Sequence, residues 1–165
     1  MNPVRASFRP QFLLGFIACA GLLAYAFYLQ LHGGLEPCPL CIFQRVAFAA
    51  LGVVFLIGAL HAPMGRARGV YGVLALLAAG SGAAIAGRHV WLQNLPPDQV
   101  PTCGPGLDYM LDAMPISSVI RKVLSGSGEC ATVDWSFIGL SMPAWTLVCF
   151  MVLAGWAAFA AFRRA

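Results

Sequence analysis

The stretch "QFLLGFIACAGLLAYAFYLQL" at residues 11–31 decides the class of fold, because it contains no charged side chain. At a rise of about 1.5 Å per residue, a helix of this length extends roughly 30 Å, which matches the hydrocarbon thickness of a bilayer. Inside that layer the backbone must satisfy its own hydrogen bonds. The stretch therefore predicts a transmembrane helix.

Three further apolar runs complete a predicted bundle of four spans, at about 11–31, 42–60, 70–90 and 142–162. The chain has 165 residues, of which 60% are hydrophobic and 10% are charged. Soluble domains carry roughly 25% charged residues, and their buried helices keep a polar stripe, so a soluble all-α protein is disfavoured. We expect one all-α membrane domain over residues 1–165, with loops at about 32–41 and 91–141.

The placement of charge predicts the orientation of the bundle. Arginines flank one end of the spans, at Arg5, Arg9, Arg66, Arg68, Arg163 and Arg164. All acidic residues fall in the two loops at the other end, at Glu36, Asp98, Asp108, Asp112, Glu129 and Asp134. Arginine-rich ends stay in the cytoplasm. Both termini are therefore expected in the cytoplasm, and the loops 32–41 and 91–141 on the outer side.

A cleaved signal peptide is the alternative interpretation of the first span. The sequence Ala24-Tyr25-Ala26 resembles a signal-peptidase site after a basic start and an apolar stretch. The apolar stretch is longer than the usual core of 7–15 residues in a signal peptide. We expect the first span to be retained.

The loop 91–141 has two parts. "NLPPDQVPTCGPG" is rich in turn-forming residues and is incompatible with a regular helix. "LDYMLDAMPISSVIRKVL" has apolar residues mostly three and four apart, interrupted by Pro115. This pattern predicts one or two short amphipathic helices, lying on the membrane surface or covering the end of the bundle.

Small residues in the third span predict close helix packing. The segment "GSGAAIAG" at residues 80–87 is small throughout except for Ile85. Pairs four apart, such as Gly80 with Ala84 and Ala83 with Gly87, let helix backbones approach each other in a membrane. We expect these pairs to face a neighbouring helix.

Four of the six cysteines lie in or beside the outer loops. Cys19 and Cys149 lie within spans and are expected to pack as small apolar residues without a chemical role. The four outer cysteines are Cys38, Cys41, Cys103 and Cys130. An even number of thiols outside the cytoplasm is typical of disulfides.

Three hypotheses compete for these four cysteines. A zinc site is disfavoured because Cys103 and Cys130 lack the close spacing of a zinc knuckle. Two structural disulfides would suit Cys103 and Cys130, but a bridge between Cys38 and Cys41 constrains little, since stabilisation grows with loop size. A C-x-x-C pair is typical of a thiol–disulfide exchange centre. The sequence favours this third hypothesis.

The surroundings of Cys41 support redox chemistry. Pro39 predicts that the second span begins near Leu40, which places Cys41 in the first helical turn. Free N–H groups and the helix dipole favour a thiolate there. Arg45 lies one turn deeper on the same face, either as a functional intramembrane charge or as a side chain that reaches the interface. His89 ends the third span at a similar depth. Arginine, imidazole and thiolate would then border one apolar pocket suited to a quinone.

Five motifs together resemble the DsbB family of disulfide-bond formation proteins. They are "CPLCIFQR", "RHVWLQNLP", "PTCGPGLDYML", "GEC" and "DWSFIGLSMPAW". The resemblance runs from about residue 12 to residue 162. It implies a four-transmembrane-helix bundle in the bacterial inner membrane, with a long periplasmic loop that carries a short amphipathic helix. It also implies a thiol:quinone oxidoreductase that reoxidises a DsbA-like periplasmic thiol oxidase and passes electrons to ubiquinone or menaquinone.

The resemblance assigns expected roles to the cysteines and to two polar side chains. Cys103 would receive the attack of the partner's thiolate, with Cys130 as its partner in a loop disulfide. Cys38 would exchange with that loop pair, and Cys41 would face the quinone. The family's quinone-site arginine and histidine correspond to Arg45 and His89. The alternative outside enzymes is a small membrane scaffold with purely structural disulfides. A vitamin K epoxide reductase type is disfavoured because its C-x-x-C lies near the last helix.

Overall fold

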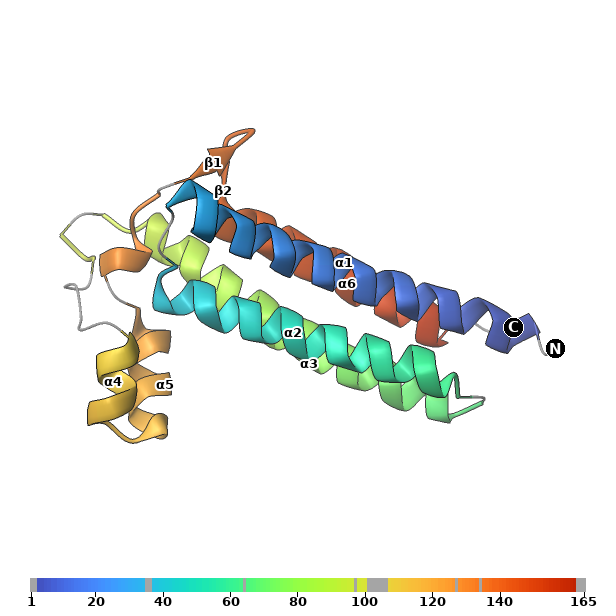
Figure 1. Ribbon diagram of the computed structural model, residues 1–165. Coiled ribbons are helices and arrows are strands. Elements are labelled where there is room, and N and C mark those ends of the chain that lie inside the picture. Colours follow the sequence, from blue (N-terminus) through green and yellow to red (C-terminus); the bar gives the residue numbers. More distant parts are fainter. Residues whose placement is uncertain are drawn as a thin grey trace.

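Four long helices run side by side in the computed structural model, which describes residues 3–34, 37–63, 65–96, 98–100, 107–126, 128–133 and 135–162 (Figure 1). They are α1 (Pro3–Gly33), α2 (Pro39–His61), α3 (Ala67–Gln93) and α6 (Met142–Phe162). Each contains a segment long and apolar enough to cross a bilayer. The expected all-α membrane bundle with four spans is therefore confirmed.

The ends of α2 follow from its sequence. Cys38 is the N-cap in an extended conformation, and Pro39 follows it as the first helical residue. Proline suits this position because its fixed φ is helical and its missing N–H has no partner there anyway. At the other end, Ala62 has a φ of 41° and its N–H donates to the Gly58 carbonyl oxygen at 2.9 Å, which closes the helix before Pro63.

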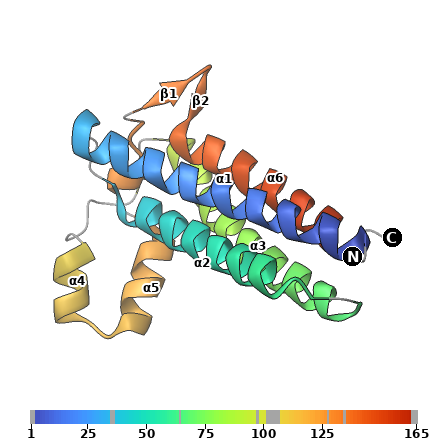
Figure 2. The same ribbon diagram turned by 45° about the vertical axis from the view of Figure 1, so that its right-hand side comes forward.

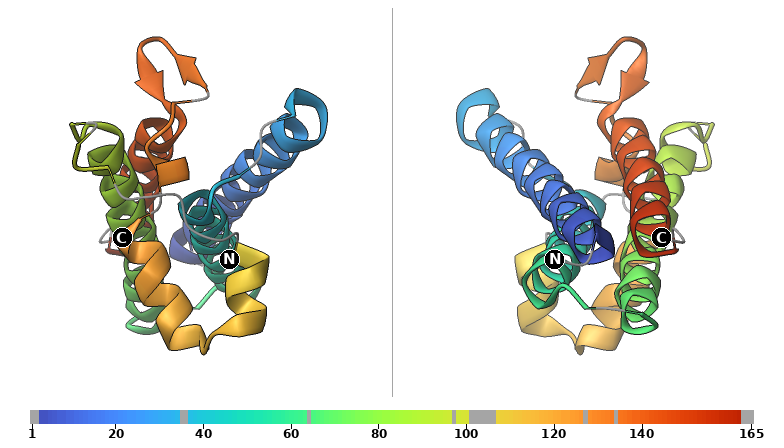
Figure 3. Two further views of the ribbon diagram at one scale, coloured as in Figure 1. Left: turned by 90° about the vertical axis from the view of Figure 1, so that its left-hand side faces the viewer. Right: turned by 90° about the vertical axis from the view of Figure 1, so that its right-hand side faces the viewer.

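The four helices do not pack equally. α2 packs along both α1 and α3, and α3 packs along α6, whereas α1 and α6 have much less contact. Seen along the bundle, α1 leans away from α6 at the end that carries α4 (Leu107–Ala113) and α5 (Ile116–Ser125) (Figure 3). This splay is where the cavity described below is found.

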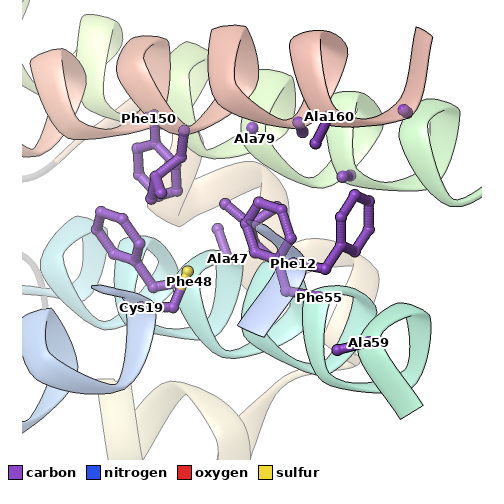
Figure 4. Packing of buried hydrophobic residues seen from close by; sticks show 14 of the residues in the cluster. Phe12, Cys19, Ala47, Phe48, Phe55, Ala59, Ala79, Phe150 and Ala160 are labelled. Carbon is purple, nitrogen blue, oxygen red and sulfur yellow. The ribbon is translucent and has the colours of Figure 1, made fainter. Parts of the chain in front are cut away.

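Aromatic rings fill the centre of the bundle, as Figure 4 shows. The Phe48 and Phe150 rings stack with centroids 3.9 Å apart, and Phe12 meets Phe55 edge-on at 5.2 Å. Gly82 makes room for one of these rings, because a Cβ at that position would collide with Phe150. The Phe150 ring of α6 thus contacts both Phe48 of α2 and Gly82 of α3.

The small residues of α3 pack as a class, but not in the expected pairs. Gly72, Ala75, Ala79, Gly82 and Ala86 are buried, at alternating spacings of three and four. Gly80 and Ala84 are exposed instead, and a Cβ on Gly80 or Gly87 would meet nothing within 4 Å. Of the expected pairs, Ala83 alone packs against the core, and the expectation was wrong for Gly80, Ala84 and Gly87. Small residues occupy several faces of the helix, so composition alone does not identify the packed one.

Two short helices and a hairpin lie at the end of the bundle opposite the two termini (Figure 1). α4 and α5 are separated at Pro115, the N-cap of α5, so the predicted amphipathic segment is two helices. After the short helix η1 (Gly128–Cys130), the strands β1 (Ser136–Phe137) and β2 (Leu140–Ser141) form a hairpin that stands off the bundle (Figure 2). Trp145 donates from Nε1 to the Phe137 carbonyl oxygen at 3.0 Å and ties the hairpin to α6.

Candidate redox site

The first turn of α2 brings the two sulfurs of the C-x-x-C pair together. The Cys38 Sγ donates a hydrogen bond to the Cys41 Sγ at 3.3 Å. Cys38 precedes the helix and Cys41 lies within its first turn, as the sequence predicts, and the Ile42 N–H donates to the Cys38 carbonyl oxygen at 3.2 Å. The pair can therefore open and close as a disulfide with only a small movement of the side chains.

His89 is buried beside this pair, with 2% of its surface exposed. Its Nε2 lies 3.8 Å from the Cys38 Sγ, and its Nδ1 accepts a hydrogen bond from the Gln44 Nε2 at 3.1 Å. The Gln44 Oε1 in turn accepts from the Thr146 Oγ1 at 2.6 Å. A polar chain thus runs from α6 through α2 to the imidazole on α3, and it fixes which ring nitrogen faces Cys38.

Cys130 reaches the same point from the long loop. Its Sγ, the Cys38 Sγ and a His89 ring nitrogen all lie within 4.8 Å of one another. Cys130 is buried in a cluster that joins α2, α3, α4 and α5 and also contains Leu40, Leu92, Met110, Val119 and Val123. This apolar cluster holds η1 against the outer end of the bundle.

Three of the four predicted redox cysteines thus meet within one site, together with His89. Cys103 lies in the segment 101–106, outside the described residues, so its contact with Cys130 stays a prediction. The roles assigned to all four cysteines also stay predictions. Geometry brings together residues whose chemistry is complementary: a dithiol, a third thiol and an imidazole.

Arg45 faces α1 rather than the histidine. Its guanidinium donates to the Gln30 Oε1 at 2.5 Å and to the Ala26 carbonyl oxygen at 3.2 Å. It also lies over the Phe27 ring, 5.0 Å from the centroid. These partners hold a positive charge at the outer end of α1, one turn below Cys41. The guanidinium is therefore fixed within the bundle and not simply extended toward water.

A cavity of about 1150 Å³ connects these groups. Its polar lining comes mainly from Cys38, Cys41, Gln44, Arg45 and His89, while Leu22, Leu23, Phe48, Met142 and Trp145 supply apolar wall. Such a combination of apolar wall and few convergent polar groups is typical of a ligand pocket. Arg45 and His89 border one pocket as predicted, although their side chains approach it from different helices.

Gln44 and Thr146 were missed in the sequence analysis. Gln44 has 3% of its surface exposed and bonds to both His89 and Thr146. An uncharged polar residue inside an apolar span indicates a functional site less strongly than a charged one does. It could still have been noticed, because polar side chains in lipid need hydrogen-bond partners. Gln44 directly precedes Arg45, so the two point to different sides of α2.

The fold and the site define a multi-pass membrane protein in which several cysteines and a buried histidine meet at one end of the bundle. The profile described as "Disulfide bond formation protein DsbB" matches residues 8–160. The chain belongs to the DsbB family and is a disulfide-forming oxidoreductase.

Curated relatives support this assignment over nearly the whole chain. A "Disulfide bond formation protein B" of Xanthomonas axonopodis pv. citri (strain 306) is 61% identical over 164 residues, which cover 99% of this chain and 95% of that protein. The protein of the same name in Methylococcus capsulatus is 54% identical over 147 residues, covering 89% and 90%. That of Hahella chejuensis is 53% identical over 156 residues, covering 94% of each.

Proposed function

We propose that this protein reoxidises a DsbA-like periplasmic thiol oxidase and passes two electrons to a membrane quinone, ubiquinone or menaquinone. One observation carries the proposal: Cys38 lies within reach of Cys130, while its neighbour Cys41 lines a large, mostly apolar cavity together with Arg45. A dithiol in this position has a thiol from the water-exposed loop on one side and an oil-compatible pocket on the other. That arrangement suits a relay between two phases.

Thiol–disulfide exchange conserves electrons at each proposed step. The partner's dithiol attacks the Cys103–Cys130 disulfide at Cys103, becomes a disulfide, and leaves Cys103 and Cys130 as thiols. The Cys38–Cys41 disulfide then oxidises that pair and becomes a dithiol itself. The close approach of the Cys130 and Cys38 sulfurs supports this second exchange. Each step requires an attacking thiolate and a good leaving thiol.

The residues around the cavity fit a quinone. The quinone ring would pack against Phe48, Leu22 and Leu23. The Arg45 guanidinium would donate a hydrogen bond to one of the quinone's carbonyl oxygens. A bound quinone supplies a two-electron, two-proton acceptor, so the Cys38–Cys41 dithiol can return to the disulfide. The His89 Nε2, 3.8 Å from the Cys38 Sγ, is placed to stabilise the thiolate that leaves during exchange.

We place the protein in the bacterial inner membrane with both termini in the cytoplasm. The support is the placement of charge: Arg5, Arg9, Arg66, Arg68, Arg163 and Arg164 flank one end of the spans, and all acidic residues fall in the other two loops. The redox site then faces the periplasm, where a soluble thiol oxidase would meet it. Labelling of Cys38 and Cys103 by an impermeant thiol reagent on opposite sides of the membrane would contradict this topology.

A quinone-reduction assay tests the proposed function. Purified protein is mixed with a reduced DsbA-like partner and a short-chain ubiquinone, and the loss of quinone absorbance is followed. We expect turnover with the native chain, none with Cys41→Ser, and native turnover with Cys19→Ala. Absence of turnover by the native chain would favour the alternative, a membrane scaffold with structural disulfides.

A further inference from the structure

We propose that the reduced protein binds Zn²⁺ through the Cys38 Sγ, the Cys130 Sγ and the His89 Nε2. These three side chains come from the N-cap of α2, from η1 and from α3, and the two sulfurs and a His89 ring nitrogen already lie within 4.8 Å of one another. Two thiolates and one imidazole form a typical ligand set for zinc. The proposal concerns the protein whose disulfides have been reduced, since only a thiolate binds the metal.

The distances are close to those that zinc requires. With Zn–S near 2.3 Å and Zn–N near 2.1 Å, tetrahedral ligands lie roughly 3.6–3.8 Å apart. The Cys38 Sγ and the His89 Nε2 are 3.8 Å apart before any adjustment. The other separations need a contraction of about 1 Å at most, which side-chain rotation provides. The Cys41 Sγ lies 3.3 Å from the Cys38 Sγ and is not one of the three proposed ligands.

Burial and charge favour a cation at this point. His89 and Cys130 are nearly fully buried, at 2% and 1% exposed. Two thiolates in such surroundings would leave an uncompensated double negative charge, which Zn²⁺ neutralises as the two thiols release their protons. Cys38 and His89 also line the cavity, which gives the ion a path of entry.

The polar chain behind His89 allows metal binding. Coordination at Nε2 requires the proton on Nδ1, so Gln44 must present its carbonyl oxygen to the ring. Turning the amide over achieves this, because Thr146 Oγ1 can then accept from the Gln44 Nε2 while it donates to the Pro143 carbonyl oxygen, 2.9 Å away. Hydrogen-bonded partners of this kind typically contribute about 10- to 100-fold to metal affinity.

Zinc bound here would inhibit the relay. It occupies Cys38 and Cys130, the two sulfurs whose exchange links the loop pair to the α2 pair. This consequence rests on the proposed function, whereas the metal site itself rests only on geometry. The oxidised protein should not bind the ion, and a chelator should restore activity.

A titration with Cd²⁺ tests the site, because Cd²⁺ binds in place of Zn²⁺ and its bond to a thiolate gives a charge-transfer absorbance. The full chain, purified without a polyhistidine tag, is reduced, desalted under argon and titrated, and Zn²⁺ is then added as competitor. We expect one ion per chain in the native protein, lost in Cys130→Ser and after oxidation. Affinity should fall at least about tenfold in His89→Ala, since even outer partners of a metal ligand contribute that much.

Matched variants separate ligation from misfolding. His32→Ala removes an exposed histidine at the same end of the bundle, and Cys19→Ala removes a buried core thiol; both should bind as the native chain does. His89→Cys replaces one zinc ligand by another and should restore binding. Equal affinity in the native chain and His89→Ala, with unchanged helical content, would overturn the inference. Loss of quinone turnover in the metal-free native chain would instead overturn the proposed function.

Discussion

The His89 Nε2 lies 3.8 Å from the Cys38 Sγ, although the two residues are 51 positions apart in the chain. The contact depends on the packing of α2 against α3, and on Gln44, which holds the other ring nitrogen at 3.1 Å. A neutral imidazole with its Nδ1 accepting from Gln44 carries its proton on Nε2, directed at the sulfur. The ring can therefore stabilise a Cys38 thiolate by a charge-assisted hydrogen bond.

Loss of the Gln44 side-chain bonds should slow the transfer of oxidising equivalents to the loop. Gln44→Leu frees the His89 ring from the bond that orients it, and one such bond contributes about 0.5–1.5 kcal/mol. We expect the rate of exchange between the loop cysteines and Cys38 to fall roughly 2- to 10-fold, measured by rapid quench with acid. Gln99→Leu, an exposed loop change, is the control, and an equal rate in both variants would contradict the orienting role.

Removal of the Arg45 guanidinium should weaken quinone use selectively. Arg45→His shortens the side chain and breaks the bonds to Gln30 and Ala26. Hydrogen bonds from a charged group contribute about 1.5–3 kcal/mol, so the KM for quinone should rise about tenfold or more while the KM for the reduced partner changes little. Arg66→His, exposed at the other end of the bundle, should leave both values unchanged. An unchanged quinone KM would return Arg45 to the role of an interfacial charge.

Cys103→Ser should abolish the reaction with the periplasmic partner. A partner that lacks its second active-site cysteine cannot resolve a mixed disulfide, so the complex with the native chain should accumulate on non-reducing gels. We expect no such complex with Cys103→Ser, and a normal one with Cys149→Ser, whose thiol lies in α6. A mixed disulfide formed by Cys103→Ser would move the point of attack to another cysteine.

Two glycines two positions apart on α3 should differ in their response to the same substitution. A Cβ at Gly82 would collide with the Phe150 ring, whereas one at Gly80 would meet nothing within 4 Å. Overpacking a core typically costs about 1–3 kcal/mol, so Gly82→Val should lower the free energy of unfolding in detergent by that amount. Gly80→Val, on the exposed face, should leave it within about 0.5 kcal/mol of the native value. Equal losses would show that α3 packs with a different face.

The sequence was sufficient to predict the transmembrane spans and the helix boundaries that proline imposes. Charge-free runs predicted four spans, and Pro39 predicted the start of α2 near Leu40. Pro115 predicted an interruption of the amphipathic segment, but left open whether it forms one helix or two. Sequence reasoning did not identify the packed face of α3. Small residues lie on several faces of that helix, and no polar residue distinguishes the face toward lipid. Gln44 and Thr146 were missed for a related reason: their partners come from other helices, and only the packing of α2 with α3 and α6 brings them together.

The contact of Cys130 with Cys38 lay beyond prediction from spacing alone. The two residues are 92 positions apart, and the intervening sequence contains no pattern that predicts which residues meet. Their approach depends on Val119 and Val123 of α5 packing beside Leu40 and Leu92, a long-range apolar contact. The hairpin at 136–141 was likewise not expected, since two residues per strand are too few for a periodic pattern.

The splay of α1 from α6 determines the route by which an apolar ligand would enter the cavity. A wholly apolar groove of about 440 Å³ lies between these helices and shares Leu22, Trp145 and Cys149 with the main cavity. An apolar ligand that diffuses laterally in the membrane could enter the main cavity through this groove without crossing the aqueous phase. Its supply would follow its mole fraction among the lipids, so membrane composition, rather than solubility in water, would set the occupancy of the cavity.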